Sequence, residues 1–71
     1  MNEDLLSRSV EELQISVRAT NSLKNENIRT IGELVQRTRG DLLRTPNLGR
    51  KSLAEIEAVL RELGLKLRDD G

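Results

Sequence analysis

The sequence contains no cysteine, no histidine and no aromatic residue among its 71 amino acids. Without cysteine, neither disulfide bonds nor thiolate zinc sites can form, and without histidine a metal ion would have to be held by oxygen ligands alone. A serine nucleophile would also lack a histidine base to activate it. We therefore expect no catalytic activity of the protein by itself, no metal site and no cofactor.

Two further absences restrict the possible partners. Proteins that bind single-stranded nucleic acid stack bases on aromatic rings, which this sequence does not have. No apolar run approaches the roughly 20 residues that span a bilayer, and the first four residues lack the basic and apolar regions of a signal peptide. We expect no membrane partner and a cytoplasmic location.

The hydrophobic residues that are present are small and aliphatic. A core would consist mainly of 13 Leu, four Ile and four Val. A protein of this length forms one small domain, and aliphatic side chains at short spacings favour helices packed on helices. The sequence therefore predicts an all-α fold, a compact bundle of four to five short helices.

The formal net charge is zero, but the charges are not evenly spread. Residues 17–52 carry eight cations and three anions, whereas both flanking segments are acidic. This asymmetry favours one face for a polyanion and other faces for different partners. A generally solvated surface is the alternative interpretation.

Capping signals predict where the first helices begin. Leu13 to Val17 alternates apolar and polar residues and is expected to be extended or irregular. Ser16 is placed to cap a helix over about residues 17–26. Thr30 and Glu33 have the spacing of a capping box, which opens a helix that ends near residue 37.

The same signals continue to the carboxyl end. Thr38 and Asp41 repeat the capping pattern and open a shorter helix that Pro46 stops. A last helix over about residues 50–63 has its apolar residues at spacings of three and four, and Gly64 is its expected end. Helix–turn–helix units are expected around residues 28–32 and 46–49.

The segment 45–53 (TPNLGRKSL) is the most informative for function. Asn47 readily accepts a left-handed conformation, and Gly49 has no side chain to keep a ligand from the backbone. The following helix would begin with free N–H groups and two cations, which favours an anion such as a phosphate. This unit is similar to the helix-hairpin-helix motif, with Asn47 in the position of the first glycine. A plain helix connection with a solvated basic start is the alternative.

Three segments together resemble a specific family. They are 17–24 (VRATNSLK), 31–38 (IGELVQRT) and 42–53 (LLRTPNLGRKSL). The sequence is similar to the C-terminal domain of the bacterial RNA polymerase alpha subunit over about residues 5–67, with residues 1–4 and 68–71 as tails. The resemblance implies two helix-hairpin-helix-like units and a tether to the N-terminal domain of alpha, and thus to the remaining polymerase subunits. The domain would then be part of a nucleotidyltransferase without being catalytic.

The resemblance also implies partners and sites. Members of this family bind the minor groove of A·T-rich DNA upstream of promoters and contact transcription activators and the sigma factor. Transferred by position, the DNA-binding residues are Arg18, Asn21, Ser22, Lys24, Gly49, Lys51, Ser52 and Glu55. A sigma-facing patch corresponds to Glu12 and Gln14, and an activator-facing patch to Thr38, Arg39, Gly40 and Asp41. Ser22 replaces a common cysteine, Gln14 a usually acidic residue, and Arg39 and Gly40 acidic and apolar residues.

The residues themselves support Arg18 as a reader of DNA. An A·T minor groove offers only acceptors and has a strong negative potential, so an inserted arginine suits it. Glu55 is expected to orient neighbouring cations, because phosphate repels a bare carboxylate. A helical protein-interaction module that does not bind DNA is the main alternative. A helix-turn-helix repressor fits less well, because the helix after Gly49 becomes apolar at Leu53.

Overall fold

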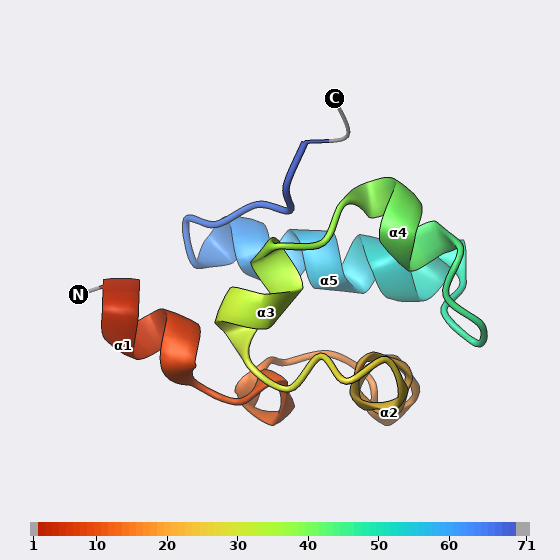
Figure 1. The fold of residues 1–71 in the computed structure, drawn as a ribbon, viewed down its shortest axis with the longest axis horizontal. Helices are drawn as coiled ribbons and strands as arrows, with labels where there is room; N and C mark the ends of the chain where they lie inside the picture. Colours follow the sequence, from red (N-terminus) through yellow and green to blue (C-terminus); the bar gives the residue numbers. More distant parts are fainter. Residues whose placement is uncertain (1, 70–71) are drawn as a thin grey trace.

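The computed structural model describes residues 2–69, and this part of the protein is all-α, as the sequence predicts (Figure 1). The elements in order are α1 (Asn2–Ser7), the 3₁₀ helix η1 (Val10–Glu12), α2 (Val17–Asn25), α3 (Ile31–Val35), α4 (Arg39–Leu43) and α5 (Arg50–Glu62). Neither α1 nor η1 was predicted from the sequence. Helix α3 also ends two residues before the predicted position.

The predicted helix starts are confirmed. The Ser16 hydroxyl accepts a hydrogen bond of 3.2 Å from the N–H of Ala19 at the start of α2. Helices α3 and α4 each begin with a complete capping box, formed by Thr30 with Glu33 and by Thr38 with Asp41. Short polar side chains therefore determine where these helices begin, because they satisfy N–H groups that have no partner inside the helix.

Residues with positive φ end the longer helices. Asn27 follows α2 with φ of 62°, and Gly64 follows α5 with φ of 76°. In each case the amide two residues beyond the cap bonds back to the helix: Ile28 to the Leu23 carbonyl at 2.9 Å, and Leu65 to the Leu60 carbonyl at 2.8 Å. These are Schellman ends. The stop at Gly64 was predicted, whereas the role of Asn27 was not.

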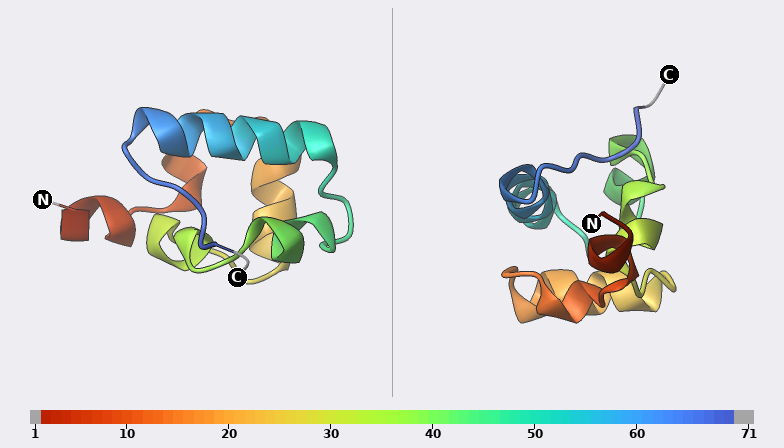
Figure 2. Two further views of the ribbon diagram at one scale, coloured as in Figure 1. Left: turned by 90° about the horizontal axis from the view of Figure 1, so that it is seen from above. Right: turned by 90° about the vertical axis from the view of Figure 1, so that its left-hand side faces the viewer.

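Helix α5 crosses α2, which is seen end-on in Figure 1 while α5 lies in the plane of the picture. Both further views show the same crossed arrangement, with α3 and α4 on a third side (Figure 2). The aliphatic side chains that these helices, η1 and the segment before α3 direct inward form one core. Its most deeply buried members are Val10, Leu23, Ile28, Ile31, Leu34, Leu42, Leu53, Ile56 and Leu60.

The segment after α5 folds back on the core, as predicted. Leu67 is buried, and Leu65 packs against the same cluster. The amide of Arg68 donates to the Arg37 carbonyl at 3.0 Å, which ties this segment to the residues before α4. None of the helices within residues 2–69 combines the length and hydrophobicity needed to cross a bilayer.

Candidate nucleic-acid interface

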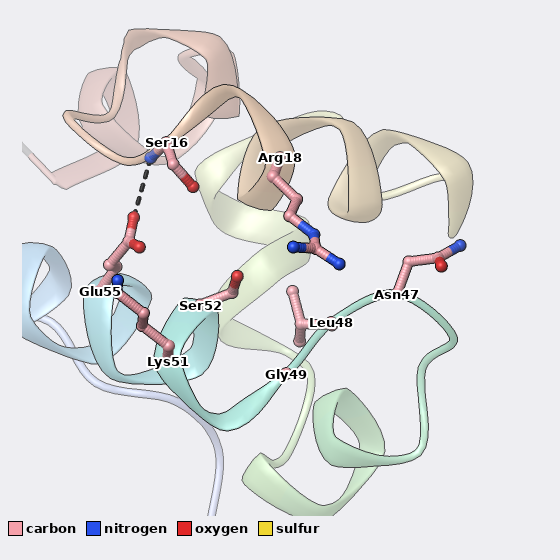
Figure 3. Close-up of a pocket in the computed structure, with 8 residues that line it drawn as sticks. All are labelled: Ser16, Arg18, Asn47, Leu48, Gly49, Lys51, Ser52 and Glu55. Carbon is pink, nitrogen blue, oxygen red and sulfur yellow. Dashed lines mark hydrogen bonds between the residues drawn. The ribbon is translucent and has the colours of Figure 1, made fainter.

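An open groove of about 520 Å³ lies between the start of α2 and the α4–α5 turn with the first turns of α5 (Figure 3). It brings together two segments that are about thirty residues apart in the sequence. The residues that line it are Ser16, Arg18, Asn47, Leu48, Gly49, Lys51, Ser52 and Glu55. Five of these eight are among the DNA-binding residues that the family resemblance implies.

Arg18 forms one wall of this groove. It lies in the first turn of α2, is exposed, and extends over the hollow toward Leu48 (Figure 3). Asn21 is exposed one turn later on the same helix but does not line the groove. The two side chains therefore share a helical face, with only Arg18 reaching over the hollow.

The N-terminus of α5 forms the opposite wall. Gly49 is the N-cap of this helix and has no side chain that could cap it. The first intrahelical bond runs from the Leu53 amide to the Gly49 carbonyl at 3.0 Å. The amides of the three residues before Leu53 therefore have no intrahelical acceptor. The positive end of the helix dipole lies at the groove, which Gly49 and exposed Lys51 line.

The conformation of Gly49 differs from that of a left-handed turn glycine. Its φ is −88° and its ψ is 176°, which other residues adopt without strain. The left-handed residue of this turn is Asn47, with φ of 68°, as predicted. A Cβ atom built at Gly49 would have no heavy atom within 4 Å. The fold therefore does not require glycine at this position, and the missing side chain keeps the α5 amides open to a ligand.

Two serines that the resemblance places on the DNA surface are buried. The Ser22 hydroxyl is hydrogen-bonded to the Asn47 carbonyl at 2.9 Å and to the Arg18 carbonyl at 3.0 Å. The side chain of Ser22 thus connects α2 with the α4–α5 turn inside the protein. Ser52 is also buried, but it lines the groove from α5.

Glu55 and Lys24 have partners within the protein. The Glu55 carboxylate accepts a hydrogen bond of 2.9 Å from the backbone N–H of Ser16, drawn as a dashed line in Figure 3. The sequence suggested cations as the partners of this carboxylate, whereas the donor in the structure is a backbone amide. Lys24 lies outside the groove and forms an ion pair of 3.1 Å with Glu11.

Three groove residues were not among the predicted site residues, namely Ser16, Asn47 and Leu48. The sequence assigned Ser16 and Asn47 to a helix cap and a turn, and the structure confirms both local roles. No local pattern indicates that the two meet at one surface. Their proximity results from the crossing of α2 and α5.

The predicted protein-contact residues lie outside this groove. Glu12 is the last residue of η1 and Gln14 follows this helix; both are exposed, and Glu12 is 3.9 Å from Arg8. In the second patch, Thr38 and Asp41 bond to each other's backbone amides. The Thr38 N–H and then its hydroxyl stabilise the carboxylate and hold the pKa of Asp41 below its usual value.

Arg39 is the more exposed of the two charged side chains in that second patch. It is exposed and lies 3.4 Å from the Glu57 carboxylate on α5. Gly40 beside it is half-buried. Thr38 and one oxygen of Asp41 are used in the capping box, and the other Asp41 oxygen pairs with Arg44 at 3.2 Å.

Comparison with known families gives a match over residues 1–62. The matching family is described as the C-terminal domain of the bacterial RNA polymerase alpha chain. The match includes all three segments on which the resemblance was based and every residue that lines the groove. The protein therefore belongs to the family of C-terminal domains of the bacterial RNA polymerase alpha subunit.

Proposed function

We propose that this domain binds A·T-rich upstream promoter DNA in the minor groove, with Arg18 as the reading side chain. The observation that carries the proposal is the juxtaposition of exposed Arg18 with the uncapped N-terminus of α5 across one open groove. One wall offers a guanidinium on a helix turn, and the other offers free amides and a lysine. This combination suits a strand of phosphates beside a narrow groove.

The two walls have different tasks in this proposal. Arg18 enters the minor groove, where A·T pairs present acceptors only and the negative potential is strongest. The α5 amides after Gly49 and the Lys51 ammonium hold the flanking phosphates and fix the register of the domain. Few phosphates are neutralised, so binding of the isolated domain is weak and falls with salt.

Protein contacts form the second part of the proposal. Exposed Glu12 and Gln14 near η1 face the sigma factor, and the patch around Arg39 and Gly40 faces transcription activators. The two patches lie outside the DNA groove, so one domain can contact DNA and protein together. Because Arg39 and Glu57 form an ion pair, an activator that contacts Arg39 competes with that carboxylate.

The decisive experiment replaces Arg18 and a matched arginine elsewhere. Arg61 is exposed on α5 and does not line the groove, so Arg61→Ala is the control for Arg18→Ala. Binding of each variant to an A·T-rich and a G·C-rich duplex is measured by fluorescence anisotropy at several salt concentrations. Arg18→Ala removes most of the A·T preference, whereas Arg61→Ala retains it.

Folding is checked with the same variants. An exposed helical position tolerates alanine, so both variants keep the circular dichroism and melting of the original protein. Equal affinity of the unsubstituted domain for both duplexes contradicts minor-groove reading. No affinity for any duplex, together with binding of a protein partner, favours the protein-interaction module instead.

A further inference from the structure

Helix α2 begins without the carboxylate that completes the capping boxes of α3 and α4. In α3 and α4, a carboxylate in the first helical turn bonds back to the amide of the capping residue: Glu33 to Thr30 at 3.0 Å, and Asp41 to Thr38 at 3.1 Å. Each box thereby satisfies two N–H groups that would otherwise have no partner. Both carboxylates belong to the helix that they cap.

In α2 the corresponding position is Ala19, which has no acceptor in its side chain. The Ser16 hydroxyl still accepts from the Ala19 amide at 3.2 Å, so half of the box is present. The other half is supplied by Glu55, whose carboxylate accepts from the Ser16 amide at 2.9 Å across a separation of 39 residues. A carboxylate on α5 therefore completes the capping box of α2.

We propose that Glu55 is a positioning residue that sets the distance between the two walls of the DNA groove by capping α2 from α5. Both ends of the bond line the groove (Figure 3). Arg18 follows Ser16 by two residues, and Lys51 precedes Glu55 by one helical turn. The bond thus joins the wall that carries Arg18 to the wall that carries Lys51.

The hydrogen bond to Ser16 also explains why the Glu55 carboxylate lies in a groove that we propose binds phosphates. A free carboxylate would repel the DNA backbone, but this one is used by a backbone N–H and is half-buried. Its charge still weakens binding of any duplex, irrespective of sequence. Capping and repulsion are therefore two separable contributions of Glu55, and the inference rests on the proposed function only for its effect on DNA.

The two contributions are separated by Glu55→Gln and Glu55→Ala. Glutamine keeps an acceptor oxygen for the Ser16 amide but removes the charge, whereas alanine removes both. Glu62→Ala, at an exposed site of the same helix, is the control. The readouts are the Ser16 amide shift and hydrogen exchange without DNA, then affinities for A·T-rich and G·C-rich duplexes.

We expect Glu55→Ala to shift the Ser16 amide, to speed its exchange and to reduce the ratio of A·T to G·C affinity about threefold or more, as the loss of one positioning hydrogen bond allows. Glu55→Gln retains the Ser16 signal and the A·T preference, and it binds both duplexes more tightly. Circular dichroism shows whether each variant is folded. If Glu55→Ala does not fold, Glu55→Gln alone tests the positioning role.

Two results overturn the positioning role. One is an unchanged Ser16 amide in folded Glu55→Ala, and the other is a loss of A·T preference in Glu55→Gln as large as in Glu55→Ala. If the unsubstituted domain shows no A·T preference, the proposed function fails, and the Ser16 measurements without DNA still decide whether Glu55 caps α2.

Discussion

The Ser22 hydroxyl lies 2.9 Å from the Asn47 carbonyl oxygen, although the two residues are 25 positions apart. This contact joins the middle of α2 to the turn before α5. Asn47 is also the left-handed residue of this turn, with φ of 68°. Buried Ser22 therefore bonds to the backbone of two residues that line the groove, Arg18 and Asn47.

Replacing Ser22 by alanine is expected to destabilise the domain by about 1 kcal/mol, the usual contribution of one such hydrogen bond. Ser22→Cys should lose less, because a thiol still donates weakly. Urea denaturation of the three proteins measures the effect. Thr20→Ala is the control, since the Thr20 hydroxyl donates to the Ser16 carbonyl, which lies at the start of the same helix. Equal stability of Ser22→Ala and the unsubstituted protein would show that the contact is not stabilising.

Gly49→Ser should change stability and DNA binding in opposite directions. Helix α5 has no cap from a side chain, and a serine in the extended conformation of Gly49 can supply one, as Ser16 does for α2. The expected gain in the free energy of unfolding is a few tenths of a kcal/mol. The new hydroxyl would occupy an amide that phosphate needs, so duplex affinity should fall. Thermal melting and fluorescence anisotropy measure the two effects, and an unchanged affinity would argue against phosphate at this helix start.

Lys51→Ala should weaken binding to A·T-rich and G·C-rich duplexes about equally. The plot of log affinity against log salt should become shallower by roughly one unit, as for one lost phosphate contact. Lys24→Ala should have a smaller effect, because Lys24 lies outside the groove and is paired with Glu11 at 3.1 Å. Salt titrations of both variants provide the comparison. If the salt dependence of binding changes more in Lys24→Ala than in Lys51→Ala, the phosphates are held near Lys24 and not at α5.

The capping box of α3 is expected to lose its stabilising contribution as the pH falls into the acid range. The backbone amide of Arg29, and then that of Thr30, hold the pKa of Glu33 below its ordinary value of 4.5. Because the folded-state pKa is depressed, this stabilisation is complete above pH 4.5 and is lost as the pH falls through the folded-state value.

Glu33→Gln tests this linkage, because glutamine keeps an acceptor for the box but does not titrate. We expect its melting temperature to fall less than that of the unsubstituted protein between pH 7 and about pH 3. Glu62→Gln, at an exposed site near the end of α5, should leave the pH profile unchanged. If the melting temperatures of Glu33→Gln and the unsubstituted protein fall equally with pH, the capping box does not contribute to the loss of stability in acid.

Local chemistry in the sequence was sufficient to predict most helix boundaries. Ser16, Thr30 and Thr38 cap helices where expected, and Asn47 and Gly64 adopt positive φ. Each of these features depends on atoms only a few residues apart, so the pattern contains all the information needed. Helix α1 was missed, because six residues are too few to show a helical repeat. It lies against α3, where Leu6 closely approaches Gly32.

The family could also be identified from the sequence, because three spaced segments together are far more specific than any one. Only the tertiary structure, however, separated the DNA-binding residues that the resemblance implies into different environments. Arg18 and Lys51 line one groove, Ser22 is buried beneath it, and Lys24 lies elsewhere with Glu11.

The partners of Ser22 and Glu55 are the clearest examples of what the tertiary structure decided. Spacing along a helix predicts neighbours at three or four residues, but these side chains bond to backbone groups 25 and 39 positions away. Such contacts exist because α2 and α5 cross over a shared core. The crossing depends on how all the buried aliphatic side chains pack together, and no single segment of the sequence specifies it.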